Sequence, residues 1–336
     1  MEGESELRRK IIKPILYIFI MSSCFINITG CGKSVLTNGT TEIKNTDETS
    51  NQVTFTDDLG REITVAHPKR VAALLGSFAD IWYLAGGSVV ACADDAWEDF
   101  DLPMAEDAIN LGMTKELSLE KLFEANPDFV IASSNTKQNI EWKETLEGAD
   151  INVAYFNINN FSDYLRVLKI FTDITGRSDL YEKNGVVIQQ KMDKIVTDCH
   201  KQIDKEQKVP KILILRASGT LIKAKGSQNN VLGELLRDLG CENIADSDTT
   251  LLENLNVEHI MLEDPDYIFV AQHGDDADAV KTHIAEFISE NPAWNNLTAI
   301  KEGNIYYMEK ELFTLKPNDR WAEAYEKASV ILFGEE

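Results

Sequence analysis

The sequence predicts an α/β fold with two Rossmann-like lobes, each built on a parallel-rich sheet, joined by one long interdomain helix. Three observations predict it. A helical run lies near the middle of the 336-residue chain, short strands alternate with helices on both sides of it, and one helix–turn–strand segment occurs once on each side. Alternating strands and helices form parallel sheets covered on both faces. A chain of this length can supply two such domains.

The long helix is predicted from about Ser178 to Gln207. Its apolar residues recur on one stripe of a 3.6-residue helix: Leu180, Val187, Ile188, Met192, Ile195, Val196, Cys199 and Ile203. Ser178 or Asp179 can cap its start, and Pro210 follows its end. Only Gly185 argues against it, at about 1 kcal/mol relative to alanine. We interpret it as a strut between lobes; a crossover helix inside one large domain or a short coiled coil are the alternatives.

Residues 1–30 are interpreted as a lipoprotein signal peptide. Four basic residues precede an apolar run from Ile15 to Ile28, which is too short for a comfortable membrane span. The run ends at Ile28-Thr29-Gly30-Cys31, which resembles a bacterial lipoprotein cleavage box. This resemblance implies that Cys31 carries the lipid (palmitate) anchor of an extracytoplasmic protein; an uncleaved signal anchor is the alternative. The polar residues 31–51 are interpreted as a flexible tether.

Charge and cysteine content exclude several classes of protein. A net charge of −23 disfavours nucleic-acid binding, which needs a basic surface. Beyond the signal peptide and Cys31, the cysteines are Cys92, Cys199 and Cys241, an odd number without CxxC spacing. The pattern indicates neither a disulfide scaffold nor a metal cluster, so we expect buried thiols.

The first lobe is predicted over residues 52–160. A hairpin from Val53 to Val65, with its turn at 58–61, opens it. Strands are predicted at 70–75, 88–93, 128–132 and 152–156, and helices at 81–85, 118–125 and 140–147. Residues 76–80 and 94–100 are interpreted as loops. Asp94-Asp95, like Asp275-Asp276, is interpreted as solvated loop charge rather than as an acid–base pair.

Helices including the strut are assigned to residues 161–208, and the second lobe to residues 209–336. The strand and helix pattern of the first lobe recurs there. Strands are predicted at 211–215, 267–271 and 304–308, and helices at 230–239, 257–263, 278–289 and 321–333.

The most specific pattern is an internal repeat. Glu120 precedes Pro127-Asp128 by seven residues, and Glu258 precedes Pro265-Asp266 by seven. In both copies proline stops a helix, aspartate starts a turn, and an apolar strand begins at once. The two glutamates therefore occupy equivalent positions, although each also suits an ordinary place near a helix amino end.

On these residues, the central helix and the lipoprotein start, the chain resembles the periplasmic-binding proteins of iron–siderophore, haem and cobalamin ABC importers. The resemblance covers about residues 53–333. It implies two lobes, a ligand cleft between them and a monomer. It also implies that Glu120 and Glu258 dock on arginines of the two permease subunits, because charges at the rim of an interface steer and register a partner. A rigid strut predicts only a small closure of the lobes.

Open α/β sheets bind ligands at the carboxyl ends of their strands, which places the cleft at the first-lobe loops 76–80, 94–100 and 110–115. The segment 316–321 of the second lobe can reach the same cleft. In the first lobe we expect the ligand to contact Ser77, Phe78, Trp82, Trp97 and Met113. In the second lobe we expect Arg216, Lys223, Lys225, Arg320 and Trp321 to contribute. Cations and aromatic rings suit an anionic, partly aromatic chelate, so a ferric siderophore is the favoured ligand, haem the second and cobalamin the third. For Phe78, Trp82, Lys223 and Lys225, core packing or solvated charge is the alternative.

Other functions are disfavoured. The histidines show no HxH or HExxH spacing, so no protein-held metal is expected, and only His273 with Met113 suits axial haem ligation. Glycine-rich phosphate motifs and GxSxG are missing, so no enzyme is expected. A nitrogenase-like two-lobe enzyme is the alternative class, but the cysteines are not placed for an iron–sulfur cluster.

Overall fold

The computed structural model describes residues 52–247, 251–252, 255–274 and 276–334. The predicted signal peptide and tether, with Cys31, lie outside the described residues. No helix within the described part is long and apolar enough to cross a membrane. The described residues belong to one compact unit, residues 49–336.

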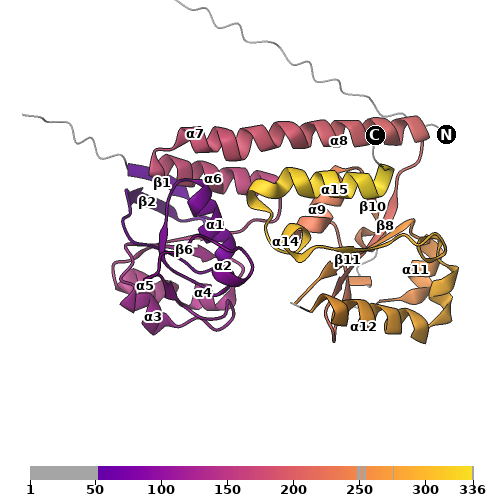
Figure 1. Cartoon of the computed structure of the whole chain (residues 1–336), viewed down its shortest axis with the longest axis horizontal. Helices are drawn as coiled ribbons and strands as arrows, with labels where there is room; N and C mark the ends of the chain where they lie inside the picture. The colour runs from indigo at the N-terminus through magenta and orange to yellow at the C-terminus, as the bar shows by residue number, and fades with distance from the viewer. Residues whose placement is uncertain (1–51, 248–250, 253–254, 275, 335–336) are drawn as a thin grey trace, which may run out of the picture. The chain divides into compact units, whose positions relative to one another are not determined.

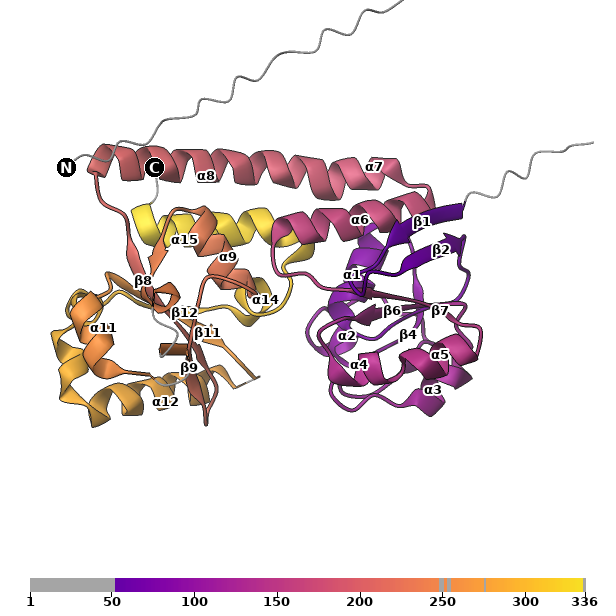
Figure 2. The ribbon, with the colours of Figure 1, turned by 180° about the vertical axis from the view of Figure 1, so that it is seen from behind.

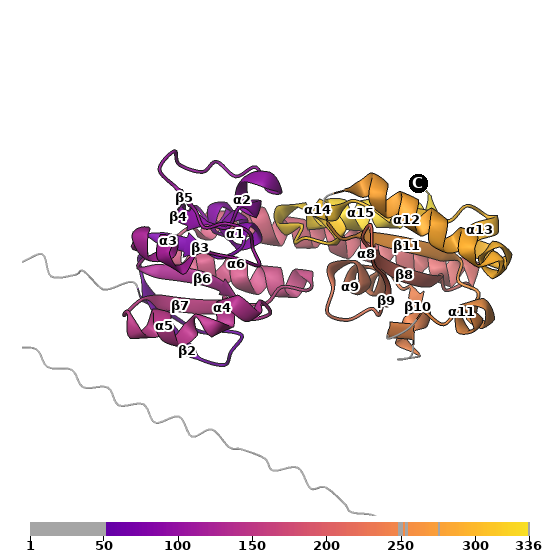
Figure 3. The ribbon, with the colours of Figure 1, turned by 90° about the horizontal axis from the view of Figure 1, so that it is seen from below.

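The first lobe is built on a five-stranded parallel sheet in the order β5-β4-β3-β6-β7 (Figure 3). Its strands are β3 (Val71–Ala73), β4 (Val89–Cys92), β5 (Ile109–Asn110), β6 (Phe129–Ser133) and β7 (Asn152–Phe156). Its helices are α1 (Gly76–Leu84), α2 (Asp95–Glu98), α3 (Leu119–Glu124), α4 (Lys137–Glu141) and α5 (Lys143–Gly148). Alternate strand residues fall in two separate apolar clusters, one on each face of the sheet. This explains why these strands are continuous apolar runs.

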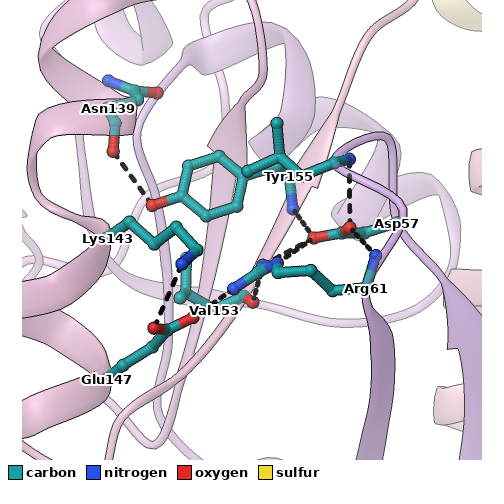
Figure 4. Close-up of polar contacts among 8 residues, drawn as sticks. Asp57, Arg61, Asn139, Lys143, Glu147, Val153 and Tyr155 are labelled. Atoms are coloured by element: carbon teal, nitrogen blue, oxygen red, sulfur yellow. Dashed lines mark hydrogen bonds and ion pairs between the residues drawn. The ribbon is translucent and has the colours of Figure 1, made fainter.

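The predicted hairpin is present as β1 (Gln52–Thr56) paired antiparallel with β2 (Glu62–Ala66). Its turn is tied to the sheet by the buried carboxylate of Asp57, which accepts hydrogen bonds from the backbone N–H groups of Leu59, Arg61 and Tyr155 (Figure 4). The Arg61 guanidinium pairs with Asp57 and Glu147 and lies over the Tyr155 ring, 4.9 Å from its centroid. Burial alone raises the pKa of Asp57, but hydrogen bonds from Arg61 and Tyr155 outweigh it and lower that pKa.

The second lobe contains a parallel sheet in the order β10-β8-β11-β12, with β9 antiparallel to β8. Its strands are β8 (Lys211–Ala217), β9 (Ile222–Lys225), β10 (Glu242–Asn243), β11 (Tyr267–Gln272) and β12 (Ile305–Met308). Its α-helices include α9 (Val231–Asp238), α11 (Val257–Glu263), α12 (Ala277–Glu290), α13 (Thr298–Lys301) and α14 (Lys310–Phe313). Short 3₁₀ helices lie at Ile244–Asp246, Pro292–Asn296 (η3) and Asn318–Arg320 (η4).

The central helix begins and ends as predicted, but one turn of it is π-helical. It runs through α7 (Ser178–Tyr181), a π-turn at Glu182–Val186 and α8 (Val187–Glu206), and Gln207 ends it in the left-handed conformation. Gly185 lies in the π-turn, where a Cβ atom would come within 2.9 Å of Leu165 in α6 (Phe161–Thr175). Glycine is therefore used for close packing of the two helices. The final helix α15 (Trp321–Phe333) packs along α8 (Figures 1 and 2).

The Pro-Asp turn of the internal repeat forms equivalent hydrogen bonds in both lobes. The Asp128 carboxylate accepts hydrogen bonds from the backbone N–H groups of Lys69 and Arg70, just before β3. The Asp266 carboxylate accepts one from Lys211, the first residue of β8. Each Pro-Asp turn therefore fixes the start of the strand next to its own. Asn126 and Asp264, at equivalent positions, both have positive φ, which these residue types tolerate.

The predicted pattern of strands and helices is confirmed, although several short elements were not predicted, and three differences affect the candidate site or its surroundings. Helix α1 begins at Gly76 rather than at about 81, and α2 replaces part of a predicted loop. The segment after β8 turns back as strand β9. The three cysteines Cys92, Cys199 and Cys241 are buried, as expected.

Candidate ligand-binding cleft

A cavity of about 910 Å³ is lined by residues of both lobes. From the first lobe it takes residues that follow β3, β4 and β5: Leu75, Ser77, Asp94, Asp95, Glu98, Asp99, Phe100, Met113, Thr114, Lys115 and Glu116. From the second lobe it takes residues that follow β11 and β12: His273, Gly274, Lys310, Thr314, Leu315 and Lys316. The carboxyl ends of the parallel strands of both sheets therefore face one cavity, the usual ligand position in open α/β sheets. Its volume is in the range of small-molecule sites.

Two polar contacts join the lobes beside this cavity. Lys310 Nζ donates to Asp99 Oδ1 at 2.7 Å, and both side chains are mostly buried. Asn318 Nδ2 donates to the backbone oxygen of Ser77 at 3.0 Å and to Asp80 Oδ2 at 2.7 Å. Asn318 lies in η4 with a φ of 53°, a conformation that asparagine tolerates better than most residues. The second lobe therefore contacts both α1 and the segment after β4.

Burial shifts the pKa values of three groups at this junction between the lobes. It raises the pKa of Asp80 to about 6, although the hydrogen bond from Asn318 opposes the change. It raises the pKa of Asp95 to about 6 as well, although Asp95 accepts a hydrogen bond from the Gly76 N–H. Burial lowers the pKa of the Lys316 ammonium, against the attraction of Asp95. The junction therefore contains acids that are easily protonated and a cation that is incompletely solvated.

Two of the residues predicted to contact a ligand line this cavity. Ser77 is nearly buried in the first turn of α1, and Met113 is 58% exposed in the segment after β5. The two residues considered for axial haem ligation, Met113 and His273, both line it, one from each lobe.

Three predicted aromatic residues are core residues instead, so the prediction that they line the cleft is wrong. Phe78 and Trp82 lie in α1 and are at most 2% exposed, packed against Phe156 and Phe129. Trp321 begins α15 and is fully buried against Phe161. The reason for the first two is the early start of α1, which turns its apolar side chains onto the sheet. Trp97, in α2, is half-buried against the same core and does not line the cavity.

The predicted cations lie around the cavity rather than on its wall. Arg216 is exposed at the end of β8, and its Nη2 lies 2.8 Å from Nδ1 of the cavity residue His273. Lys223 and Lys225 lie on β9; burial, with the nearby charges of Arg216 and Lys223, lowers the pKa of Lys225. Arg320 pairs with Glu323. Of these four, only Arg216 contacts a cavity residue through a hydrogen bond.

The segments 94–100 and 316–321 are predicted to reach the cleft, but of their charged side chains only Arg320 is a predicted ligand contact. The charged lining residues outside that prediction are Asp94, Asp95, Glu98, Asp99, Lys310 and Lys316. The interpretation of Asp94 and Asp95 as solvated loop charges is wrong, because both line the cavity. Asp95 begins α2, and its carboxylate accepts a hydrogen bond from the Gly76 N–H at the start of α1. All six follow the carboxyl ends of predicted strands, at 88–93 and 304–308. Their position after the ends of these strands was the sequence signal that could have identified them as cavity residues. Asp276 caps α12, and Asp275 lies outside the described residues.

The predicted docking residues Glu120 and Glu258 are exposed, each in the first turn of its helix. On the same helix faces lie exposed apolar side chains. Phe123, three residues after Glu120, is 40% exposed, and Leu262, four residues after Glu258, is 79% exposed.

A cavity at the strand ends of both lobes is where a two-lobe α/β protein binds its ligand. Comparison with known proteins identifies which kind. The model of the periplasmic binding protein family matches residues 71–312, so the chain belongs to that family. It is 26% identical over 306 residues to the Fe(3+)-citrate-binding protein YfmC of Bacillus subtilis (strain 168), covering 88% of this chain and 89% of that protein.

Solved structures show the same fold. An ABC transporter substrate-binding protein from Listeria monocytogenes EGD-e has a TM-score of 0.66 at 20% identity, over 79% of this chain and 99% of that one. Staphylococcus aureus IsdE, complexed with heme, has a TM-score of 0.65 at 17% identity, over 79% of this chain and 98% of that one. The chain is thus an extracytoplasmic substrate-binding protein of an ABC importer, not an enzyme, and its relatives include binding proteins for Fe(3+)-citrate, iron(3+)-hydroxamate and heme.

Proposed function

We propose that this protein is a lipid-anchored receptor that captures a ferric siderophore in the cavity between its lobes and delivers it to the permease. The observation that carries the proposal is the cavity itself. It is large enough for a chelate, it is lined from both lobes, and it combines cations of the second lobe with carboxylates and hydroxyl groups of the first. Fe(3+)-citrate binding by YfmC supports iron chelates as the ligand class.

Anchoring and docking complete the proposed cycle. Cys31 attaches the protein to the outer face of the cell membrane, and residues 31–51 act as the tether. The loaded protein presents Glu120 and Glu258, one from each lobe, to the two permease subunits. Helices α8 and α15 pack along each other, which favours a small movement of the lobes over a wide hinge motion.

Haem is the second candidate ligand, because His273 and Met113 line the same cavity. Arg216 Nη2 lies 2.8 Å from Nδ1 and 3.2 Å from Nε2 of His273. An arginine donates to a ring nitrogen only through the lone pair that iron would need. This contact favours the siderophore over haem. Cobalamin is third.

Isothermal titration of the full chain in mild detergent tests the proposal. Preformed ferric citrate, ferric hydroxamate, ferric catecholate, haem and cobalamin are titrated separately, with each iron-free chelator as its control. We expect saturable sub-micromolar binding of one class of ferric siderophore. Haem as the tightest ligand would replace the siderophore, and no binding by any of them would overturn the proposed function.

A further inference from the structure

The two walls of the cavity carry opposite charge. The first-lobe wall holds five carboxylates, from Asp94, Asp95, Glu98, Asp99 and Glu116, and one ammonium, from Lys115. The described part of the second-lobe wall holds the ammonium groups of Lys310 and Lys316, with His273, and no carboxylate. Among the described residues, the first-lobe wall is therefore mainly acidic and the second-lobe wall basic.

Three of the first-lobe carboxylates form no ion pair within the described residues. Asp99 and Lys310 pair across the cavity. Within the described residues, Asp94, Glu98 and Glu116 form no side-chain hydrogen bond or ion pair with any other group. Lys316 likewise forms none, although burial lowers its pKa. Charged groups that face a cavity without partners favour a ligand that supplies them.

A ligand of a single charge sign fits only half of this cavity. An anionic chelate is attracted to the second-lobe wall and repelled by the carboxylates of the first, while a purely cationic ligand meets the reverse. Nor do the carboxylates form a metal site, because no group of three or more potential metal ligands occurs among the described residues. The arrangement suits an oxygen-rich chelate that also carries a protonated amine.

We propose, building on the proposed function, that the cavity selects a ferric chelate bearing at least one ammonium group. Its metal-binding oxygens face Lys316 of the second lobe, and its ammonium group faces Asp94 and Glu98 of the first. The carboxylates of the first lobe thus determine specificity, because they exclude chelates that are only anionic.

Two chelates that differ in one charge test this proposal directly. The first is the ferric complex of a linear trihydroxamate with a terminal primary amine, and the second is the same complex with that amine acetylated. Both are titrated into the full chain in mild detergent at pH 7.4 and low salt. We expect the amine form to bind at least tenfold more tightly. The ratio should shrink as sodium chloride is raised, since salt screens exposed charges.

A double variant assigns the effect to the first-lobe wall. Asp94→Asn with Glu98→Gln is expected to reduce the ratio of the two affinities to less than threefold. Both substitutions keep the size of the side chain. The control Glu124→Gln with Glu286→Gln removes two exposed charges outside the cavity and is expected to leave the ratio unchanged.

The outcomes separate this inference from the proposed function. Equal binding of the two complexes, or tighter binding of the acetylated one, overturns the selection for an ammonium group and leaves chelate capture standing. Tighter binding of ferric citrate or a ferric catecholate than of the amine form overturns it too. If none of these complexes or haem binds to the folded protein, the proposed function fails and this inference fails with it.

Discussion

The two lobes share the same arrangement of parallel strands and Pro-Asp turns, and they differ in the residues that line the cavity. Each has a parallel sheet in which a Pro-Asp turn fixes the start of a neighbouring strand, through Asp128 in one lobe and Asp266 in the other. Yet the charged side chains that line the cavity, among the described residues, are mostly carboxylates in the first lobe and ammonium groups in the second. The repeat therefore aligns neighbouring strands in the same way in both lobes, and the cavity is lined by residues outside it.

The lobes also differ in how their sheets are supported. In the first lobe the β1–β2 hairpin is joined to the sheet through Asp57 and Arg61. In the second lobe, strand β9 pairs directly with β8 and needs no such charged junction. Removing one partner of a buried charge pair lowers the stability of the fold, because it leaves the other charge uncompensated. Pairing through backbone groups does not depend on a particular side chain.

The largest expected effect concerns the position that the lobes share. Charge reversal of both docking glutamates, Glu120→Arg with Glu258→Arg, is expected to abolish uptake of radioactive iron by iron-limited cells. Each single reversal should give a partial loss, because the remaining lobe still registers with the permease. The affinity for the chelate should stay within twofold, since neither residue lines the cavity.

The control for this test is Glu62→Arg with Glu286→Arg, which makes the same charge changes at exposed positions of the two lobes outside α3 and α11. It is expected to leave uptake unchanged. Normal uptake by the Glu120 and Glu258 double variant, at normal protein levels on the cell surface, would refute docking through these residues.

The second prediction concerns the ion pair of Asp57 and Arg61, which joins the β1–β2 hairpin to the sheet of the first lobe. Asp57→Ala leaves Arg61 without its buried partner and three backbone N–H groups without an acceptor. We expect the free energy of unfolding to fall by about 3 to 5 kcal/mol. Chemical denaturation followed by circular dichroism measures it. Glu62→Ala, an exposed change in the same hairpin, should alter it by less than about 0.5 kcal/mol; a loss as small as this for Asp57→Ala would contradict the role of the junction.

Sequence reasoning predicted the fold well because its signals are local. Apolar periodicity marked the strut, and the Glu-x6-Pro-Asp spacing marked both copies of the repeat. The site was predicted less well, because the side on which Phe78 and Trp82 lie depends on where α1 begins, five residues before the apolar pattern indicates. The pairing of Asp99 with Lys310 joins residues from different lobes, and no local pattern relates them.

The third prediction concerns pH and the contact between the lobes. Burial raises the pKa of Asp80 from 3.8 to about 6, so the folded protein holds this proton more tightly than the unfolded chain. The resulting stabilisation is fully present below about pH 4 and is lost as pH rises through about 6. Relative to the unmutated protein, Asp80→Asn should therefore gain stability with rising pH, by about 3 kcal/mol between pH 4 and pH 7.5.

Denaturation midpoints across this pH range measure the gain. Asp278→Asn, a change at a side chain that is 94% exposed, serves as the control and should follow the unmutated protein. A constant difference between Asp80→Asn and the unmutated protein at every pH would show that Asp80 does not titrate in this range.

The smallest effect tests whether the repeat is energetically equivalent in the two lobes. Asp128→Ala removes the acceptor for two backbone N–H groups, and Asp266→Ala removes the acceptor for one N–H and for the exposed ammonium of Lys208. A hydrogen bond from a backbone amide to a carboxylate contributes about 1.5 to 3 kcal/mol, whereas an exposed ion pair contributes about 0 to 1 kcal/mol. We therefore expect Asp128→Ala to cost about 1 kcal/mol more than Asp266→Ala in denaturation experiments. Raising the salt concentration should reduce the cost of Asp266→Ala alone, because only that aspartate forms an ion pair in this turn; an equal response of both variants to salt would show that the two turns are held by the same interactions.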